Sequence, residues 1–443
     1  MRCFRFVAAA AAAAAVAVAG AAQWIVDDDG PADFSSVHAA VNAPYVLAGD
    51  TIVVRPGTYV ENLLLDAKDL TIRSERGPFV TILDGQESGS VVMLLDRGPT
   101  ARIEGFTIRN GRDQTGGGIW IAGGAPVITR NVIEANEAVG GYLGYGYGGG
   151  IEVYSSAATI TRNVIRNNVA LDGGGGIDVY YSGPSTPGTC CPVIAQNTIV
   201  DNVVTAATGM GGGILAFASE PDIASTILLG NEAALGGGIF VERVQGNGDL
   251  PDATTNVLFG NLPDAADSSG TWHLPASNLE VDPRLGPGER IALWPRSDSP
   301  ALDAAGGGLP AGPDLIGTAS SADGDVDGAA APDIGAIESL GEVTGVTAST
   351  DPGDPETIIL SWDGSVNPGA LFNVYGSDDA PFVTGGGACL AVFLATTSHA
   401  DPAPLLPGRI RYYLVAAQQE VEGSRGLRSD GTPRPSLPSC TGP

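Results

Sequence analysis

The chain has 443 residues, of which 64 are glycine, and its formal net charge is −28 at pH 7. This acidity argues against nucleic acid and anionic membranes as partners, and against a polyanionic substrate unless a divalent cation intervenes. The length allows more than one domain, and abundant glycine with only 6% aromatic residues suits many small turns rather than one large aromatic core.

The first 22 residues have the pattern of an export signal. Arg2 and Arg5 precede an Ala/Val run at 6–18, and the small residues 19–21 form a cleavage-site pattern. No later stretch is long and apolar enough to span a bilayer. These features predict a secreted or extracellular, cell-surface protein without a transmembrane segment.

The next segment predicts a capped end of a larger β-structure. Residues 24–29 form a candidate strand, and Asp33 is a candidate N-cap for a short helix at 34–42. Residues 48–62 then give a strand, a Pro-Gly turn and a second strand. The amphipathic helix is expected to cover the open end of the β-structure, as terminal repeats must.

A Gly-Gly-Gly-Ile motif organises the middle of the chain. It occurs five times, at 116–119, 148–151, 174–177, 211–214 and 236–239. The isoleucines are 32, 26, 37 and 25 residues apart, and a constant motif at variable spacing indicates fixed short strands with variable loops. Because no helical pattern separates the strands, each unit is expected to be one coil of a right-handed, single-stranded parallel β-helix.

Asparagines recur in register with these coils. One column contains Asn131, Asn163 and Asn197, with Thr226 in the fourth position. The second column consists of Asn136, Asn168, Asn202, Asn231 and Asn261. A buried amide both donates and accepts hydrogen bonds, so each column is expected to form a ladder between coils about 4.8 Å apart.

The opening "GDTIVVRPGTYVENL" and the coils that follow resemble secreted right-handed β-helix proteins of the pectin-lyase-like superfamily. The resemblance covers 24–340 and implies the fold for 23–340. It does not imply one activity, because that fold carries lyases, hydrolases, esterases, epimerases and non-enzymatic adhesins. The Gly-Gly-Gly-Ile alternation is also similar to repeats in bacterial surface adhesins.

Residues 256–340 are expected to close the rod. Within them, Asp323, Asp325 and Asp327 with Gly328 match the start of an EF-hand loop, so calcium is a possible cofactor. The position of the expected bidentate Glu holds Ile334, which favours an acidic solvated turn instead. No other cofactor is indicated.

Residues 341–443 show alternating strands that predict a small β-sandwich resembling a fibronectin type III domain. Export permits disulfides, and we expect one between Cys389 and Cys440. The state of the adjacent Cys190 and Cys191 is left open, because neighbouring cysteines form a strained ring.

Strand alternation predicts an outward face beside the inward Ile and Val positions. It carries the candidate glycan-binding residues Trp120, Tyr154, Tyr180 and Phe240, with Leu215, Phe217 and Glu242 on the same face. Glu152 and Asp178 would lie about 5 Å apart there and are the candidate catalytic acids. Arg130 and Arg162 form a rival basic column, and Arg166 facing Glu134 predicts an ion pair between coils.

Two functions are consistent with this pattern. One is an adhesin-like protein that binds an extracellular polysaccharide or cell-surface glycan, because aromatic faces stack on sugars and acids accept hydroxyl hydrogen bonds. The other is a polysaccharide lyase or glycoside hydrolase. The three histidines lie outside the five regular coils, and the catalytic signatures of pectinesterases and polygalacturonases are missing, which favours binding.

Overall fold

The structure of the protein is a computed structural model. It describes residues 21–141, 145–183, 191–242, 251–263, 265–267, 274–285, 293, 295, 299–306, 313–315 and 332–337, together with six strands between 347 and 418.

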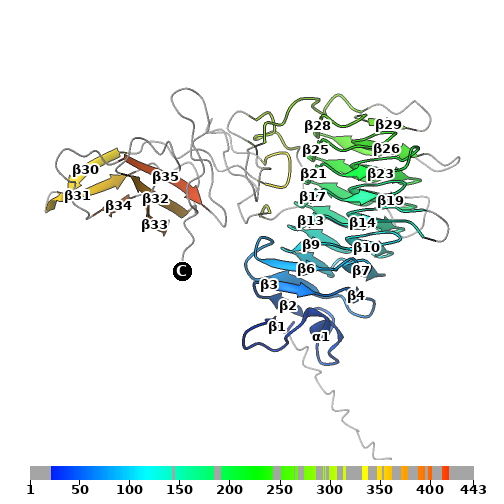
Figure 1. Cartoon of the computed structure of the whole chain (residues 1–443), viewed down its shortest axis with the longest axis horizontal. Helices are drawn as coiled ribbons and strands as arrows, with labels where there is room; N and C mark the ends of the chain where they lie inside the picture. Colours follow the sequence, from blue (N-terminus) through cyan, green and yellow to red (C-terminus); the bar gives the residue numbers. More distant parts are fainter. Residues whose placement is uncertain are drawn as a thin grey trace, which may run out of the picture.

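The main body is a solenoid of parallel strands, as the repeat spacing predicts (Figure 1). Sheet A contains β1 (Gln23–Val26), β2 (Thr51–Val54), β5 (Thr71–Ser74), β8 (Arg102–Glu104), β12 (Val127–Thr129), β16 (Thr159–Thr161), β20 (Val193–Ala195), β24 (Asp222–Ala224) and β27 (Asp252–Thr254). Sheet B contains β3 (Gly57–Val60), β6 (Thr81–Asp84), β9 (Thr107–Arg109), β13 (Val132–Glu134), β17 (Val164–Arg166), β21 (Thr198–Val200), β25 (Ile227–Leu229) and β28 (Val257–Phe259).

The remaining solenoid strands form two more sheets. Sheet C contains β4 (Leu63–Leu65), β7 (Val92–Leu95), β11 (Ile119–Ala122), β15 (Ile151–Tyr154), β19 (Ile177–Tyr180), β23 (Ile214–Phe217), β26 (Ile239–Glu242) and β29 (Ala265–Asp267). Sheet D contains the two-residue strands β10 (Arg112–Asp113), β14 (Glu137–Ala138), β18 (Val169–Ala170) and β22 (Val203–Val204). This is the all-β, right-handed β-helix that the sequence predicts.

Equivalent residues of successive coils stack in register to fill the interior. Ile151 pairs with Ile119 on one side and Ile177 on the other, and all three are fully buried. Sheets A and B contribute similar columns, in which Ile128 stacks on Ile160 and Ile133 on Ile165. Each such side chain contributes on the order of 1.5–3 kcal/mol by burial, so the interior is a continuous aliphatic core.

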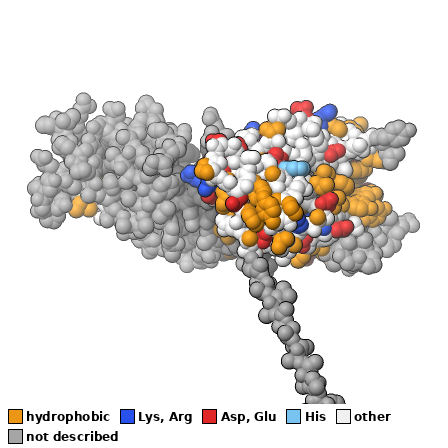
Figure 2. All heavy atoms as spheres, turned by 90° about the horizontal axis from the view of Figure 1, so that it is seen from below, with side chains coloured by type: hydrophobic (Ala, Val, Ile, Leu, Met, Phe, Trp, Pro, Cys, Tyr) orange, Lys and Arg blue, Asp and Glu red, His pale blue; other side chains and the backbone are white. Residues whose placement is uncertain are grey.

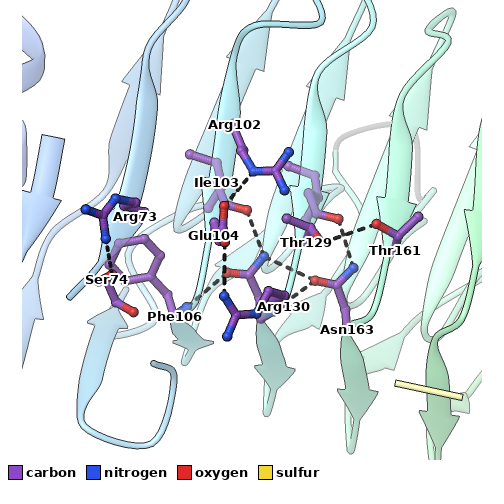
Figure 3. A network of polar contacts seen from close by, with 12 residues as sticks. Arg73, Ser74, Arg102, Ile103, Glu104, Phe106, Thr129, Arg130, Thr161 and Asn163 are labelled. Carbon is purple, nitrogen blue, oxygen red and sulfur yellow. Dashed lines mark hydrogen bonds and ion pairs between the residues drawn. The ribbon is translucent and has the colours of Figure 1, made fainter. Parts of the chain in front are cut away.

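Both asparagine ladders form as predicted. The Asn163 side chain accepts from the backbone N–H and the amide of Asn131, at 2.9 and 3.1 Å, and donates to Ile128 O and to Asn197 at 3.0 and 3.1 Å (Figure 3). The column is longer than predicted, because Asn256 and Asn278 extend it. Residues that precede the ladder positions, such as Arg130 (φ 58°) and Arg162 (φ 57°), adopt the left-handed conformation that makes each corner a two-residue turn.

The triple-glycine turns are needed for two separate reasons. The first glycine has a positive φ, as at Gly148 (67°) and Gly174 (61°). The third lies against the next coil, and a Cβ on Gly150 would be 2.6 Å from Gly176 O. Any side chain there would force the coils apart.

A short helix closes the N-terminal end. Helix α1 (Val37–Asn42) lies within the range predicted for it, 34–42, and buries Val37, Ala40 and Val41. The predicted cap was wrong: Ser36 caps the helix by accepting from Ala39 N, whereas Asp33 accepts from Ile25 N at 2.8 Å. Hydrophobic side chains gather on the end of the solenoid that faces the viewer in Figure 2.

The chain after the last coil does more than the closing of the rod expected for 256–340. Strands β27 and β28 add one more coil, but later described segments lie along the outer face of sheet B. Leu315, Ala336 and Ile337 pack against Val132, Val164 and Val200. Ala336 N also donates to Thr198 Oγ1 at 3.0 Å. These segments act as a strap that shields the apolar outer residues of sheet B.

The C-terminal strands pair antiparallel. One sheet has the order β30 (Thr347–Asp351), β31 (Asp354–Ser361) and β34 (Ser398–Asp401). The other has the order β33 (Ala388–Leu394), β32 (Leu371–Ser377) and β35 (Tyr412–Gln418).

Replacing Gly150 by alanine tests the packing of the turn. We expect a loss near the upper end of ~1–3 kcal/mol in the free energy of unfolding, measured by urea titration, because the new Cβ overlaps a backbone carbonyl. Gly260→Ala is the control: its φ is +65° but nothing lies within 4 Å of the added Cβ, so only about 1 kcal/mol should be lost. Equal losses would contradict this account.

The ladder is tested at Asn163. Asn163→Ala leaves two donors of Asn131 and the carbonyl of Ile128 without partners, so we expect a loss of roughly 3–5 kcal/mol in the same titration. Asn163→Thr should lose less, because Thr226 occupies the same column and still accepts from Asn197 N at 3.3 Å. A threonine variant as unstable as the alanine variant would argue against the ladder's role.

Candidate functional site

Sheet C presents two columns of residues to its outer side. The first outward column consists of Met93, Trp120, Glu152, Asp178, Leu215 and Phe240. The second outward column consists of Leu95, Ala122, Tyr154, Tyr180, Phe217 and Glu242. The sequence therefore placed its candidate residues on one face correctly.

The first outward column is mostly buried, which corrects the expectation of an open face. Asp178, Leu215 and Phe240 are 0–2% exposed, and Glu152 is 7% exposed. The glycine turn that precedes β11, β15, β19, β23 and β26 contributes to this burial: its first glycine folds back against the base of the outward residue, and a Cβ on Gly174 would be 2.6 Å from Asp178 Cβ. Phe240 is consequently not available as a sugar-stacking ring.

Glu152 and Asp178 form a buried acid pair on adjacent strands. They are register partners, about 4.8 Å apart between backbones. Both carboxylate oxygens of Asp178 and Oε2 of Glu152 are buried without a hydrogen-bond partner. A buried carboxylate without a partner costs free energy of folding, so binding of a proton or a cation would stabilise this pair.

Burial sets the protonation of both acids. It raises the pKa of Glu152 to about 8. Burial also raises the pKa of Asp178 well above its ordinary value and the charge of Glu152 adds to this, while a hydrogen bond from the backbone N–H of Val179 acts in the opposite direction. Two like charges this close are unfavourable in a dry site, so the pair holds at least one proton at neutral pH.

The aromatic side chains of the second outward column stack on one another. Tyr180 lies between Tyr154, at 5.9 Å between ring centroids and 19° between planes, and Phe217, at 4.8 Å and 20°. Both faces of Tyr180 are therefore occupied, which excludes it as a stacking platform and corrects that assignment. Tyr145 and Tyr147 continue the cluster beside Tyr180, and Asp178 contributes to a raised Tyr147 pKa of about 12, after burial.

Tyr154 has one free face because its other neighbour is small. Its ring stacks on Tyr180, and the next strand on the opposite side carries Ala122, followed by Leu95 on the strand beyond. Tyr154 is 44% exposed. We call the gap over Ala122, between Tyr154 and Leu95, the Ala122 notch.

The notch has the size and polar surroundings of a binding subsite. Its two walls are two strand spacings apart, roughly 10 Å, and a ring stacks at roughly 3.5–4.0 Å from its partner, so one ring fits. Trp120 and Glu152 lie beside it in the first outward column and pair in register. The exposed Asp96 reaches the turn after Ala122, since its Oδ1 lies 2.1 Å from where a Cβ of Gly123 would be.

The rival basic column is not available for catalysis. Arg130 donates to Glu104 Oε1 at 3.2 Å (Figure 3). It also donates to Asp314 O at 2.6 Å, which holds the strap to the solenoid. Arg162 is buried, with 4% exposure. The predicted ion pair between Arg166 and Glu134 is present at 2.7 Å.

Some predicted sites lie outside the described residues. These are the acidic loop with Asp323, Asp325 and Asp327, and Cys440. Cys389 lies in β33, where only the backbone is described.

The sequence analysis missed the notch and Asp96. Aligning the fourth residue of each strand after Gly-Gly-Gly would have shown Ala122 as the one small residue, at the start of a series of larger ones. The position of Asp96 across Gly123 depends on the stacking of neighbouring turns and has no comparable signal.

Comparison with known proteins supports the fold. Residues 80–248 match the family described as right handed beta helix region. No curated protein and no solved structure matches the chain. The repeats are therefore those of a right-handed β-helix protein, and within the described residues no helix has the length and apolarity to cross a membrane.

The acid pair should make stability depend on pH. Glu152 has a pKa of about 8 when folded against an ordinary 4.5, so the folded protein holds more protons between these values and its stability falls as pH rises through them. Asp178→Asn and Glu152→Gln should both reduce this fall, which is seen by comparing melting temperatures from pH 5 to 9. The control is Glu242→Gln on the same sheet, and a decline as steep in the pair variants as in the wild type would refute the assignment.

Proposed function

We propose that the protein binds an extracellular polysaccharide or cell-surface glycan at the Ala122 notch. The observation that carries this is the free face of Tyr154 over Ala122, bounded by Leu95 and next to Glu152 and Trp120. An aromatic face packs on the apolar face of a sugar ring, while carboxyl groups at its edge accept hydroxyl hydrogen bonds. Asp96 and Glu152 are placed for the second role.

Charge favours a glycan without acidic groups. The outward residues of the sheet C strands β4, β7, β11, β15, β19, β23 and β26 include no Lys or Arg, and the chain carries a net charge of −28. A uronic-acid polymer would be repelled there. This also disfavours a lyase, which needs a basic residue beside its substrate.

The location and modular arrangement are part of the same proposal. Residues 1–22 have the features of an export signal, and a secreted or cell-surface protein would meet glycans. Residues 341–443 would be a fibronectin type III-like spacer stapled by Cys389–Cys440. Strands β30, β31 and β34 form one sheet and β32, β33 and β35 form another, which supports such a β-sandwich. For the solenoid, the resemblance of the coils to pectin-lyase-like proteins supports the proposal.

A glycoside hydrolase is the second candidate. Glu152 beside the notch has the raised pKa of a general acid, about 8. Asp178 is fully buried and cannot reach a substrate as the second carboxylate. Release of reducing ends from neutral polysaccharides, abolished by Glu152→Gln, would establish hydrolysis; binding without release would leave the protein as a binder.

Filling the notch should separate binding from folding. Ala122→Phe extends the stack of Tyr154, Tyr180 and Phe217 by one ring, so thermal stability should be kept while glycan binding on an array is lost at least tenfold. Tyr154→Ala should lose binding similarly, because it removes the stacking face.

The matched control for Tyr154 is Tyr45→Ala, which removes a comparably exposed tyrosine (57%) from the segment after α1. It should leave binding unchanged. Unaltered binding in Ala122→Phe, with the protein folded, would rule out the notch as the site.

A further inference from the structure

Within the described residues, the buried acid pair has no counter-ion on the outer side of sheet C. Three carboxylate oxygens of Glu152 and Asp178 lack any hydrogen-bond partner. Their register neighbours are Trp120 on one side and Leu215 on the other, neither of which can neutralise a carboxylate. Among the described residues, folding has thus placed these carboxylate acceptors together without a side-chain donor, and only the backbone N–H of Val179 is directed toward Asp178, unlike in a satisfied structural network.

The surroundings match an organic cation better than a metal ion. Calcium takes six to eight oxygen ligands and magnesium keeps several waters, whereas this pair lies among aromatic and aliphatic side chains. Within the described part of the chain, the three acids that lie close enough together to hold a metal ion are Asp27, Asp28 and Asp29 in the first coil. Glu152 and Asp178 are not part of such a group. Aromatic rings attract ammonium groups through their faces, and Trp is the strongest partner for that contact.

The notch and the pair are adjacent along the same strands. Ala122 is two residues from Trp120, and Tyr154 is two residues from Glu152, so the two columns are neighbours on the outer face. A sugar ring stacked on Tyr154 would direct a substituent toward Glu152, the more exposed acid of the pair, with Asp178 directly behind it.

We propose that the glycan bound at the Ala122 notch contains an amino sugar, whose ammonium group is bound by Glu152 beside Trp120, while the buried Asp178 acts on it only through Glu152. This rests on the proposed glycan-binding function and specifies its substrate class. The ammonium donates to Glu152, and Asp178 accepts or shares the remaining proton. The acidity of the whole chain would raise the local concentration of such a cationic polymer.

The test compares two oligosaccharides that differ only in the amine. Glucosamine hexamer and N-acetylglucosamine hexamer are titrated calorimetrically into the full chain at pH 6. We expect the glucosamine hexamer to bind at least tenfold more tightly. Glu152→Gln and Asp178→Asn should lose this preference, retaining whatever affinity the stacking on Tyr154 gives to the acetylated hexamer.

The control is Glu242→Gln, which removes one negative charge from the second outward column of the same sheet and should keep the preference. Circular dichroism confirms that each variant is folded. Equal affinity of the wild type for both hexamers, with Tyr154→Ala abolishing both, would overturn the amino-sugar assignment and leave glycan binding standing. Failure of a broad glycan array to bind would overturn both.

A metal ion is the other possible occupant, and calcium alone is its probe. A rise in melting temperature with millimolar calcium that is lost in Asp178→Asn would show a metal site at the pair and overturn the ammonium assignment. No such rise, together with the tenfold amine preference, supports it.

Discussion

The structure depends on how closely one coil can approach the next. Backbone hydrogen bonding fixes the spacing at about 4.8 Å, and every turn must fit within it. The tightest place is the triple-glycine turn, where a Cβ on Gly150 would be 2.6 Å from the carbonyl of Gly176. Corners that lack this crowding are instead held by asparagine amides, which hydrogen-bond to the coils above and below. At the triple-glycine corner the absence of a Cβ lets the coils approach, and at the other corners asparagine side chains form hydrogen bonds between coils.

The same close turns create the candidate site. Because the triple-glycine turns fold back over the first outward residue of five strands, most of that column is buried even though it faces away from the core. Four of the six residues in this column are apolar or aromatic (Met93, Trp120, Leu215 and Phe240), and burying them fully or partly costs little. At Glu152 and Asp178, two acids are buried, and their pKa values rise for lack of water and of partners. A cost of this kind in an otherwise regular repeat points to a ligand-binding role.

The second outward column shows how stacking limits recognition. Regular repetition stacks aromatic rings face to face along the solenoid. Rings stacked on both sides, such as Tyr180, then have no free face with which to bind a sugar. Binding surface therefore arises where the repeat is interrupted, at Ala122. The strap on sheet B has the complementary effect, because it covers the apolar flank there and occupies Arg130. Sheet C is left as the flank with both an open aromatic face and acidic groups.

The sequence by itself determined the coil architecture, the isoleucine columns and both asparagine ladders, because these follow from short motifs that repeat along the chain. It also placed Trp120, Glu152, Tyr154 and Asp178 on one face, since strand alternation fixes direction. Only the tertiary structure decided which of those residues water can reach. Exposure depends on how a neighbouring turn or ring lies over a side chain, as for Asp178 and Phe240, and on segments distant in sequence, such as the strap over Arg130. The spacing of residues within a motif does not predict those contacts.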